Sequence, residues 1–229
     1  MNIKHSFYAI IVAGGNGKRM ESDLPKQFIV LNGKPILMHT INAFSQNIHQ
    51  PKIILVLAKE DAMLWQNLVE QYQFNIPHLI VYGGKERFHS VKNALEQIKD
   101  NHSIVAIHDA VRPLVSQQTI SNCFVSAQKH GNAVAAVPAK DSVRRQINHI
   151  SEALVRSEIF LVQTPQTFKF EQLYNAYSQD FEAAFTDDAS VVEKAGFFIQ
   201  IEKGDDFNLK LTFKEDLLLA EAILKARIS

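Results

Sequence analysis

Short apolar runs alternate with helix-period segments from the start of the chain to about residue 138, and this alternation constrains the fold more than any other feature. The runs are continuous and rich in β-branched and aliphatic residues, which is typical of strands covered on both faces in a parallel sheet. One intervening segment carries the helical stripe Val91, Ala94, Leu95 and Ile98. The pattern predicts an α/β sandwich with ligands bound where strands end. The predicted strands are Phe7–Val12, Ile53–Ala58, Leu79–Tyr82, Ile104–Ile107 and Ala133–Val137, and the predicted helices are Pro35–Phe44, Asp61–Tyr72, Glu86–Ile98 and Gln117–His130.

The pattern changes after Lys140. Residues 141–161 are mostly polar with isolated apolar side chains, which predicts a hairpin-like arm rather than another strand–helix unit. Because a two-stranded hairpin is marginal alone in water, we expect the arm to pack on something, such as a second subunit. No linker or repeat divides the chain, so residues 1–229 are predicted to form a single domain. The later predicted elements are helices at Phe170–Ser178 and Asp187–Ala195, strands at Phe197–Ile201 and Leu209–Leu211, and a final helix after a capping box of Thr212 and Glu215.

The balance of charge argues against several classes of function. The chain has 24 Lys and Arg against 24 Asp and Glu, so it lacks the bulk positive charge of a nucleic-acid or anionic-membrane binder. No apolar run approaches the ~20 residues of a membrane-spanning helix. A single cysteine, Cys123, cannot form an internal disulfide, which is consistent with a reducing compartment. We therefore expect a cytoplasmic protein that binds neither nucleic acid nor membrane.

A glycine-rich segment follows the first predicted strand. Gly14, Gly15 and Gly17 crowd into four positions, and Arg19 and Lys26 lie just beyond them. Glycines let backbone N–H groups approach phosphate oxygens closely, and the two cations add charge that the backbone lacks. The spacing matches neither the Walker A loop nor the dinucleotide fingerprint. The segment predicts a phosphate-binding loop, with a glycine-rich turn flanked by solvated cations as the alternative.

Two further segments place candidate groups at strand ends. Gly83 and Gly84 close the strand before a helix, where a backbone-lined slot could read the edge of a base and the Ser90 hydroxyl could donate or accept. Asp109 follows the strand Ile104–Ile107, and Mg²⁺ is commonly bound by one or two carboxylates together with substrate phosphates. The plain alternatives are a turn that starts a helix and an aspartate that caps the following turn.

These segments and several later ones, taken in order, resemble the 2-C-methyl-D-erythritol 4-phosphate cytidylyltransferases of the non-mevalonate isoprenoid pathway. The resemblance runs from residue 13 to about residue 216, which is nearly the whole chain. The matching blocks are Ala13-Gly14-Gly15-x-Gly17-x-Arg19-Met20 with Pro25-Lys26-Gln27, Gly83-Gly84-x-x-Arg87-x-x-Ser90-Val91, His108-Asp109-Ala110-x-Arg112-Pro113, Lys140-Asp141-Ser142, Arg156, Thr164-Pro165-Gln166, Thr186-Asp187-Asp188-Ala189-Ser190 and Asn208-Leu209-Lys210.

The resemblance implies a fold and an activity. The fold is a Rossmann-like, mostly parallel sheet with flanking helices, of the nucleotide-diphospho-sugar transferase type, with a protruding β-arm that dimerises. The activity is transfer of a cytidylyl group from CTP to the polyol phosphate 2-C-methyl-D-erythritol 4-phosphate, with release of pyrophosphate and with Mg²⁺ or another divalent cation as cofactor. Since the acceptor phosphate is already an anionic nucleophile, positioned cations rather than a strong base meet the needs of this reaction.

The resemblance also implies roles for individual residues. It assigns catalysis to Arg19 and Lys26 and metal binding to Asp109, and it suggests that Arg156 reaches the site of a neighbouring subunit. Lys85 stands where the family often has an acidic residue. The implied nucleotide-binding residues are Ala13, Gly14, Gly15, Gly17, Gly84, Lys85 and Ser90, and the implied acceptor-binding residues are Arg156, Thr164, Thr186, Asp206 and Lys210.

Three other functions fit parts of the sequence. Cytidylyltransferases that act on ribitol 5-phosphate look very similar and share most of the blocks. A nucleotide-binding protein without catalysis would not require both Arg19 and Lys26. A dinucleotide-dependent oxidoreductase fits the α/β pattern but not Met20, which stands where the fingerprint needs its third glycine.

Overall fold

The molecule is built on a seven-stranded sheet with the strand order β11-β7-β10-β6-β1-β4-β5. The structure, a computed structural model, describes residues 5–14 and 24–228. The sheet strands are β1 (Phe7–Val12), β4 (Lys52–Leu57), β5 (Leu79–Tyr82), β6 (Ile104–Asp109), β7 (Asn132–Pro138), β10 (Phe160–Lys169) and β11 (Ile201–Lys203), and the helices are α1 (Ile36–Ser45), α2 (Ala62–Gln71), α3 (Arg87–Leu95), α4 (Gln117–His130), α5 (Phe170–Ala176), α6 (Asp188–Lys194) and α7 (Lys214–Ile228).

Six of the seven strands run in the same direction. β1 pairs in parallel with both β4 and β6, β4 with β5, and β11 with β7. β10 is antiparallel to both of its neighbours, β6 and β7, so those two strands are parallel to each other. The carboxyl ends of the parallel strands therefore meet at one edge of the sheet, where α/β proteins bind ligands. This arrangement confirms the predicted Rossmann-like, mostly parallel fold.

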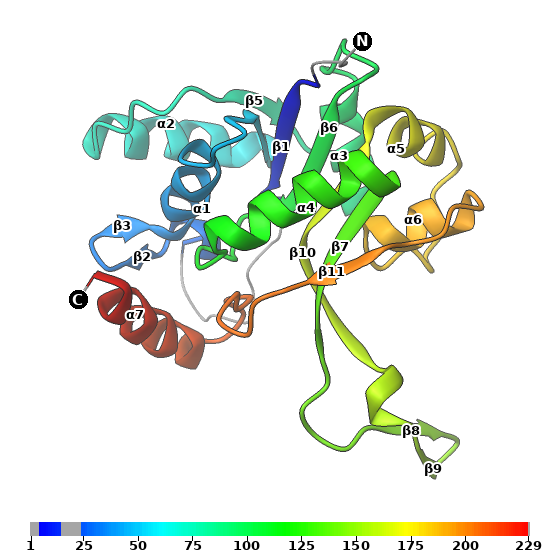
Figure 1. The fold of residues 1–229 in the computed structure, drawn as a ribbon. Coiled ribbons are helices and arrows are strands. Elements are labelled where there is room, and N and C mark those ends of the chain that lie inside the picture. The colour runs from blue at the N-terminus through cyan, green and yellow to red at the C-terminus, as the bar shows by residue number, and fades with distance from the viewer. Residues whose placement is uncertain (1–4, 15–23, 229) are drawn as a thin grey trace.

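Helices cover both faces of the sheet, because successive side chains of a strand point to opposite faces. On β1, Ala9 and Ile11 pack with α1, α2 and α4 around Trp65 and Phe124. Ile10, between them, packs with α3, α5 and α6 on the other face. Figure 1 shows these two helical layers on either side of the strands.

A third, smaller core lies beside the sheet. It joins α7 to the short strands β2 (Val30–Leu31) and β3 (Lys34–Pro35), which form a separate two-stranded sheet. Leu31, Leu211 and Ala220 are all buried there. The contact fixes the segment that leads from β11 into α7, and with it the position of Lys210.

The predicted arm projects from the main body. β8 (Arg144–Ile147) and β9 (Ile150–Ala153) form an antiparallel hairpin that is separate from the main sheet, and both strands are exposed. The 3-10 helix η4 (Arg156–Glu158) and strand β10 return the chain to the body. Figure 1 shows the hairpin standing well away from the rest of the fold.

The structure differs from the local predictions at four places. β10 was not predicted, although it lies inside the main sheet between β6 and β7. β11 spans Ile201–Lys203 rather than Phe197–Ile201, and residues 209–211 form no strand. The final helix begins at Lys214, and its start is capped by the Asp216 carboxylate, which accepts from the N–H groups of Thr212 and Phe213 at 2.7 and 2.8 Å. The predicted capping box of Thr212 and Glu215 is therefore wrong.

Among the helices of residues 5–14 and 24–228, none combines the length and the apolar character that crossing a membrane would require.

Candidate active site

A cavity of about 320 Å³ lies at the carboxyl edge of the sheet. Three backbone hydrogen bonds bring its walls together: Ala13 N–H donates to Val56 O at 2.8 Å, Gly83 N–H to Leu57 O at 2.8 Å, and Ala110 N–H to Val12 O at 3.0 Å. The cavity is lined by Val12, Ala13, Gly14, Lys26, Gln27, Gly84, Lys85, Glu86, Arg87, Ser90, Asp109, Ala110, Val111 and Lys210.

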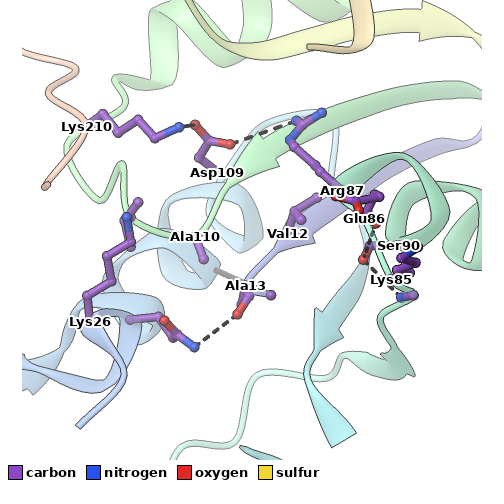
Figure 2. A pocket seen from close by; sticks show the side chains of 14 residues that line it. Val12, Ala13, Lys26, Lys85, Glu86, Arg87, Ser90, Asp109, Ala110 and Lys210 are labelled. Atoms are coloured by element: carbon purple, nitrogen blue, oxygen red, sulfur yellow. Dashed lines mark hydrogen bonds and ion pairs between the residues drawn. The ribbon is translucent and has the colours of Figure 1, made fainter. Parts of the chain in front are cut away.

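Asp109 is the charged centre of this cavity. Its Oδ2 lies 3.0 Å from Lys210 Nζ and 3.5 Å from Arg112 Nε, and its Oδ1 lies 3.8 Å from Arg87 Nη2. Figure 2 shows Asp109 between Lys210 and Arg87. Burial alone would raise the pKa of Asp109, but the charges of Arg87, Lys210 and Arg112 outweigh burial and hold the pKa well below its usual range. The carboxyl group is therefore ionised at neutral pH.

The backbone of Asp109 is held by a side chain from β10. Asp109 N–H donates a 3.0 Å hydrogen bond to Thr164 Oγ1, and Thr164 is itself buried. Asn208 Nδ2 donates to the carbonyl of Thr164 at 2.7 Å, which links β10 to the segment that carries Lys210. Thr164 thus contacts the main chain of Asp109 and does not line the cavity.

The glycine slot after β5 is closed by Ser90. Gly84 N–H donates to Ser90 Oγ at 3.1 Å, and the Ser90 hydroxyl donates to Glu86 O at 3.1 Å. A Cβ on Gly84 would collide with His89, so this position requires glycine. A Cβ on Gly14 would lie only 3.9 Å from Ser90 Oγ, so the slot and the end of β1 are neighbours in space.

Lys26 lies on the opposite side of the cavity from the glycine slot, and the residue that follows it, Gln27, fixes the backbone there. Lys26 begins the 3-10 helix η2 (Lys26–Phe28), and Gln27 in the same turn is buried. Gln27 Nε2 donates to Ala13 O at 3.0 Å and to Asp61 Oδ2 at 3.1 Å. The side chain of Gln27 therefore ties η2 to the end of β1, and Figure 2 shows Lys26 on that side of the cavity.

A second cavity, of about 510 Å³, adjoins the first and shares Lys210 with it. Its lining includes the apolar side chains of Val137, Leu161 and Val162 and the charged side chains of Lys140 and Asp206. Lys140 Nζ and Asp206 form an exposed ion pair at 2.9 Å. Because Lys210 stands between the two cavities, a group bound in the second could reach a ligand bound in the first.

The structure brings together eight of the predicted site residues and separates others. Arg156 and Thr186 are exposed and line neither cavity, and Arg156 Nη1 donates to Lys140 O at 3.1 Å. Gly15, Gly17 and Arg19 lie outside the described residues. The eight that share the first cavity are Ala13, Gly14, Lys26, Gly84, Lys85, Ser90, Asp109 and Lys210.

Sequence reasoning gave no role to Arg87, Arg112 or Gln27, although each lies within a matched block. The side chains of Arg87 and Arg112 lie beside Asp109, and the side chain of Gln27 donates to Ala13 O. These three side chains come from different parts of the fold. Among the described residues, no group of three or more His, Cys, Asp or Glu side chains could hold a metal ion. Asp109 nevertheless suits Mg²⁺, because phosphates of a bound ligand commonly complete the coordination of a single carboxylate.

The sheet and the cavity at its carboxyl edge define an α/β protein of the Rossmann-like class. The family model described as 2-C-methyl-D-erythritol 4-phosphate cytidylyltransferase matches residues 7–226. Proteins of that name from Bacteroides thetaiotaomicron and Azobacteroides pseudotrichonymphae are 44% and 47% identical to the chain, over 94% and 95% of it and 98% of each relative. The chain belongs to the 2-C-methyl-D-erythritol 4-phosphate cytidylyltransferase family and is therefore a nucleotidyltransferase, as the sequence blocks predicted.

Solved structures agree with this assignment. The 4-diphosphocytidyl-2C-methyl-D-erythritol synthase of Anaerococcus prevotii matches with a TM-score of 0.81 at 28% identity, over 96% of each chain. The 2-C-methyl-D-erythritol 4-phosphate cytidylyltransferase of Francisella tularensis matches with a TM-score of 0.79 at 33% identity, over 95% of this chain and 99% of that one.

Proposed function

We propose that this protein transfers a cytidylyl group from CTP to 2-C-methyl-D-erythritol 4-phosphate, giving 4-diphosphocytidyl-2-C-methyl-D-erythritol and pyrophosphate in isoprenoid precursor biosynthesis in the cytoplasm. The observation that carries the proposal is the cavity at the carboxyl edge of the sheet, where Asp109 lies among cations beside a glycine slot. Membership of the cytidylyltransferase family supports the choice of both substrates.

The nucleotide half of the site lies between the ends of β1 and β5. Gly84, Lys85 and Ser90 would receive the cytosine and the ribose, because backbone groups and one hydroxyl line this slot. Ala13 and Gly14 would direct the triphosphate toward Lys26, and Gly15, Gly17 and Arg19 would complete this loop. Lys85 is exposed where it lines the cavity, and its main-chain groups would contact the base.

The chemical step is an in-line displacement at the α-phosphorus of CTP. An oxygen of the acceptor phosphate forms the new bond to phosphorus, the bond to the oxygen bridging to the β-phosphorus breaks, and pyrophosphate leaves with that electron pair. Lys26 and Arg19 would stabilise the charge that builds on the α-phosphate oxygens in the transition state. Asp109 would hold Mg²⁺, which neutralises phosphate charge when bound.

The acceptor half of the site is the second cavity. Lys210 would orient the acceptor phosphate for attack, because its ammonium stands at the boundary of both cavities. Asp206, which lines the second cavity, would bind acceptor hydroxyls, and Thr164 would support this side by fixing the Asp109 backbone. Thr186 is exposed and lines neither cavity, so its contact with the acceptor stays a prediction.

The arm at residues 141–161 would join two copies of the chain. It leaves Ile147 at 56%, Ile150 at 75% and Leu161 at 55% exposure, and a second arm would cover these apolar side chains. Arg156 lies within the arm, in η4, and lines neither cavity of its own subunit. It would therefore complete the acceptor site of the neighbouring subunit.

A pyrophosphate-release assay tests the proposed function. Four nucleoside triphosphates are each combined with 2-C-methyl-D-erythritol 4-phosphate or ribitol 5-phosphate, with and without Mg²⁺. We expect release only with CTP, the methylerythritol phosphate and metal. Turnover with ribitol 5-phosphate instead would reassign the acceptor, and CTP binding without any release would indicate a regulatory nucleotide-binding protein.

A further inference from the structure

A buried carboxylate outside the cavity carries three strong hydrogen bonds. Asp188, the first residue of α6, is fully buried. Arg87 donates to it in a bidentate manner, from Nη1 to Oδ1 and from Nη2 to Oδ2, both at 2.7 Å. The hydroxyl of buried Tyr177 donates to Oδ1 at 2.6 Å. A bidentate arginine–carboxylate pair fixes direction as well as distance, so the guanidinium of Arg87 has one defined orientation.

The same guanidinium faces the candidate metal ligand. Nη2 of Arg87 lies 3.8 Å from Asp109 Oδ1, which is too long for a hydrogen bond. The other oxygen, Oδ2, is the one in contact with Lys210 and Arg112. Arg87 thus lies between two carboxylates, bonded to the buried Asp188 and held about one ångström short of a bond to Asp109.

We infer that Asp188 is a positioning residue that holds Arg87 away from Asp109, so that Asp109 Oδ1 remains available to the cation of a metal–nucleotide complex. The inference rests on the proposed function in taking Asp109 as the metal ligand. Asp188 itself is fully buried and does not line the cavity, so it acts through Arg87 and not by contact with substrate.

The physical reason is competition between two carboxylates for one partly buried cation: the Arg87 side chain is 32% exposed, whereas Asp188 is fully buried and Asp109 is only 13% exposed. A partly desolvated guanidinium that loses its bidentate partner is expected to pair with another anion within reach, because an uncompensated charge there is costly. With Asp188 neutral, the partner within reach is Asp109, and a small movement of the guanidinium would close the pair. An incoming metal would then have to displace Arg87 before it could bind Oδ1.

The test measures how strongly metal improves CTP binding, without any turnover. Isothermal titration calorimetry gives the Kd of CTP in EDTA and in excess Mg²⁺, with no acceptor present, for wild type and Asp188→Asn. Since neighbours of metal ligands change metal affinity by about 10- to 100-fold, we expect the Mg²⁺ enhancement to fall about tenfold in Asp188→Asn. The Kd in EDTA should stay within about twofold, because the glycine slot is untouched.

Two further variants make the result specific. The double variant Arg87→Gln/Asp188→Asn removes the competing cation, and replacing both members of the pair leaves no unpaired charge behind. We expect the double variant to recover the Mg²⁺ enhancement of CTP binding. If Asp188→Asn does not fold, the double variant carries the test by itself. Glu182→Gln is the matched control. It removes an exposed carboxylate that pairs at 3.1 Å with Lys194, which lies in α6 together with Asp188.

The outcomes separate this inference from the proposed function. An unchanged enhancement in Asp188→Asn, or a double variant that stays impaired, overturns the role of Asp188 while leaving the proposed reaction intact. Equal losses of CTP affinity in EDTA and in Mg²⁺ would show a merely structural role and also overturn it. If Mg²⁺ does not improve CTP binding to the wild type, the assignment of Asp109 as metal ligand fails, and this inference fails with it.

Discussion

Replacing Thr164 by valine removes one hydroxyl from beneath Asp109 while keeping the shape of the side chain. The Asp109 N–H then loses the acceptor that lies 3.0 Å away, in a place where both residues are buried. An orphaned buried N–H costs about 1–3 kcal/mol. At about 3 °C per kcal/mol for a chain of this size, the expected loss in Tm is about 6 °C. We also expect kcat to fall about tenfold as Asp109 loses its fixed position.

The assays are thermal unfolding followed by circular dichroism and pyrophosphate release at saturating substrates. Thr164→Ser is the matched control, because it retains the hydroxyl that accepts from Asp109 N–H. It should keep a Tm and kcat close to those of the wild type. A Thr164→Val protein with an unchanged Tm and a raised KM for the acceptor alone would refute this reasoning, since that result would place the hydroxyl on the substrate.

Three other perturbations test separate parts of the site and the arm. Lys26→Ala should leave the circular dichroism spectrum unchanged and lower kcat for pyrophosphate release by at least ~10², so near-normal turnover would remove Lys26 from the mechanism. The pKa of Asp109 is depressed in the folded state, so the unfolded state binds more protons and the free energy of unfolding falls as pH drops below about 4. Urea unfolding of Asp109→Asn should show a weaker fall over that range, and an identical profile would contradict the depressed pKa. Ile150→Glu at the exposed tip should halve the mass found by analytical ultracentrifugation, whereas Val125→Glu, at a 53% exposed position on α4, should not. An unchanged mass in Ile150→Glu would exclude the arm tip from dimerisation.

The sheet was largely predictable because its parallel strands are buried on both faces. β1, β4 and β6 read as continuous apolar runs for that reason, and the sequence placed each within a residue or two of its observed bounds. β10 was missed because its middle, Gln163 to Gln166, contains a proline, which argues against a central strand. The sheet register shifts between Val162 and Gln166, and that irregularity accommodates the proline.

The candidate site was predictable only where residues follow strand ends. Gly14, Gly84 and Asp109 share one edge because parallel strands bring their carboxyl ends together. The contacts of Arg87 with Asp188 and of Thr164 with Asp109 join segments that are 101 and 55 residues apart. No local pattern encodes such pairings, which depend on how α6 packs on the sheet and on the insertion of β10 between β6 and β7.

A crystal structure of the protein with CTP and Mg²⁺, in the absence of acceptor, tests the central claim most directly. The account predicts the cytosine in the cavity against Gly84 and Ser90, the α-phosphate within hydrogen-bond reach of the Lys26 ammonium, and the metal on Asp109. A triphosphate bound elsewhere, with Lys26 turned to solvent and Asp109 still closed on Lys210, would contradict it.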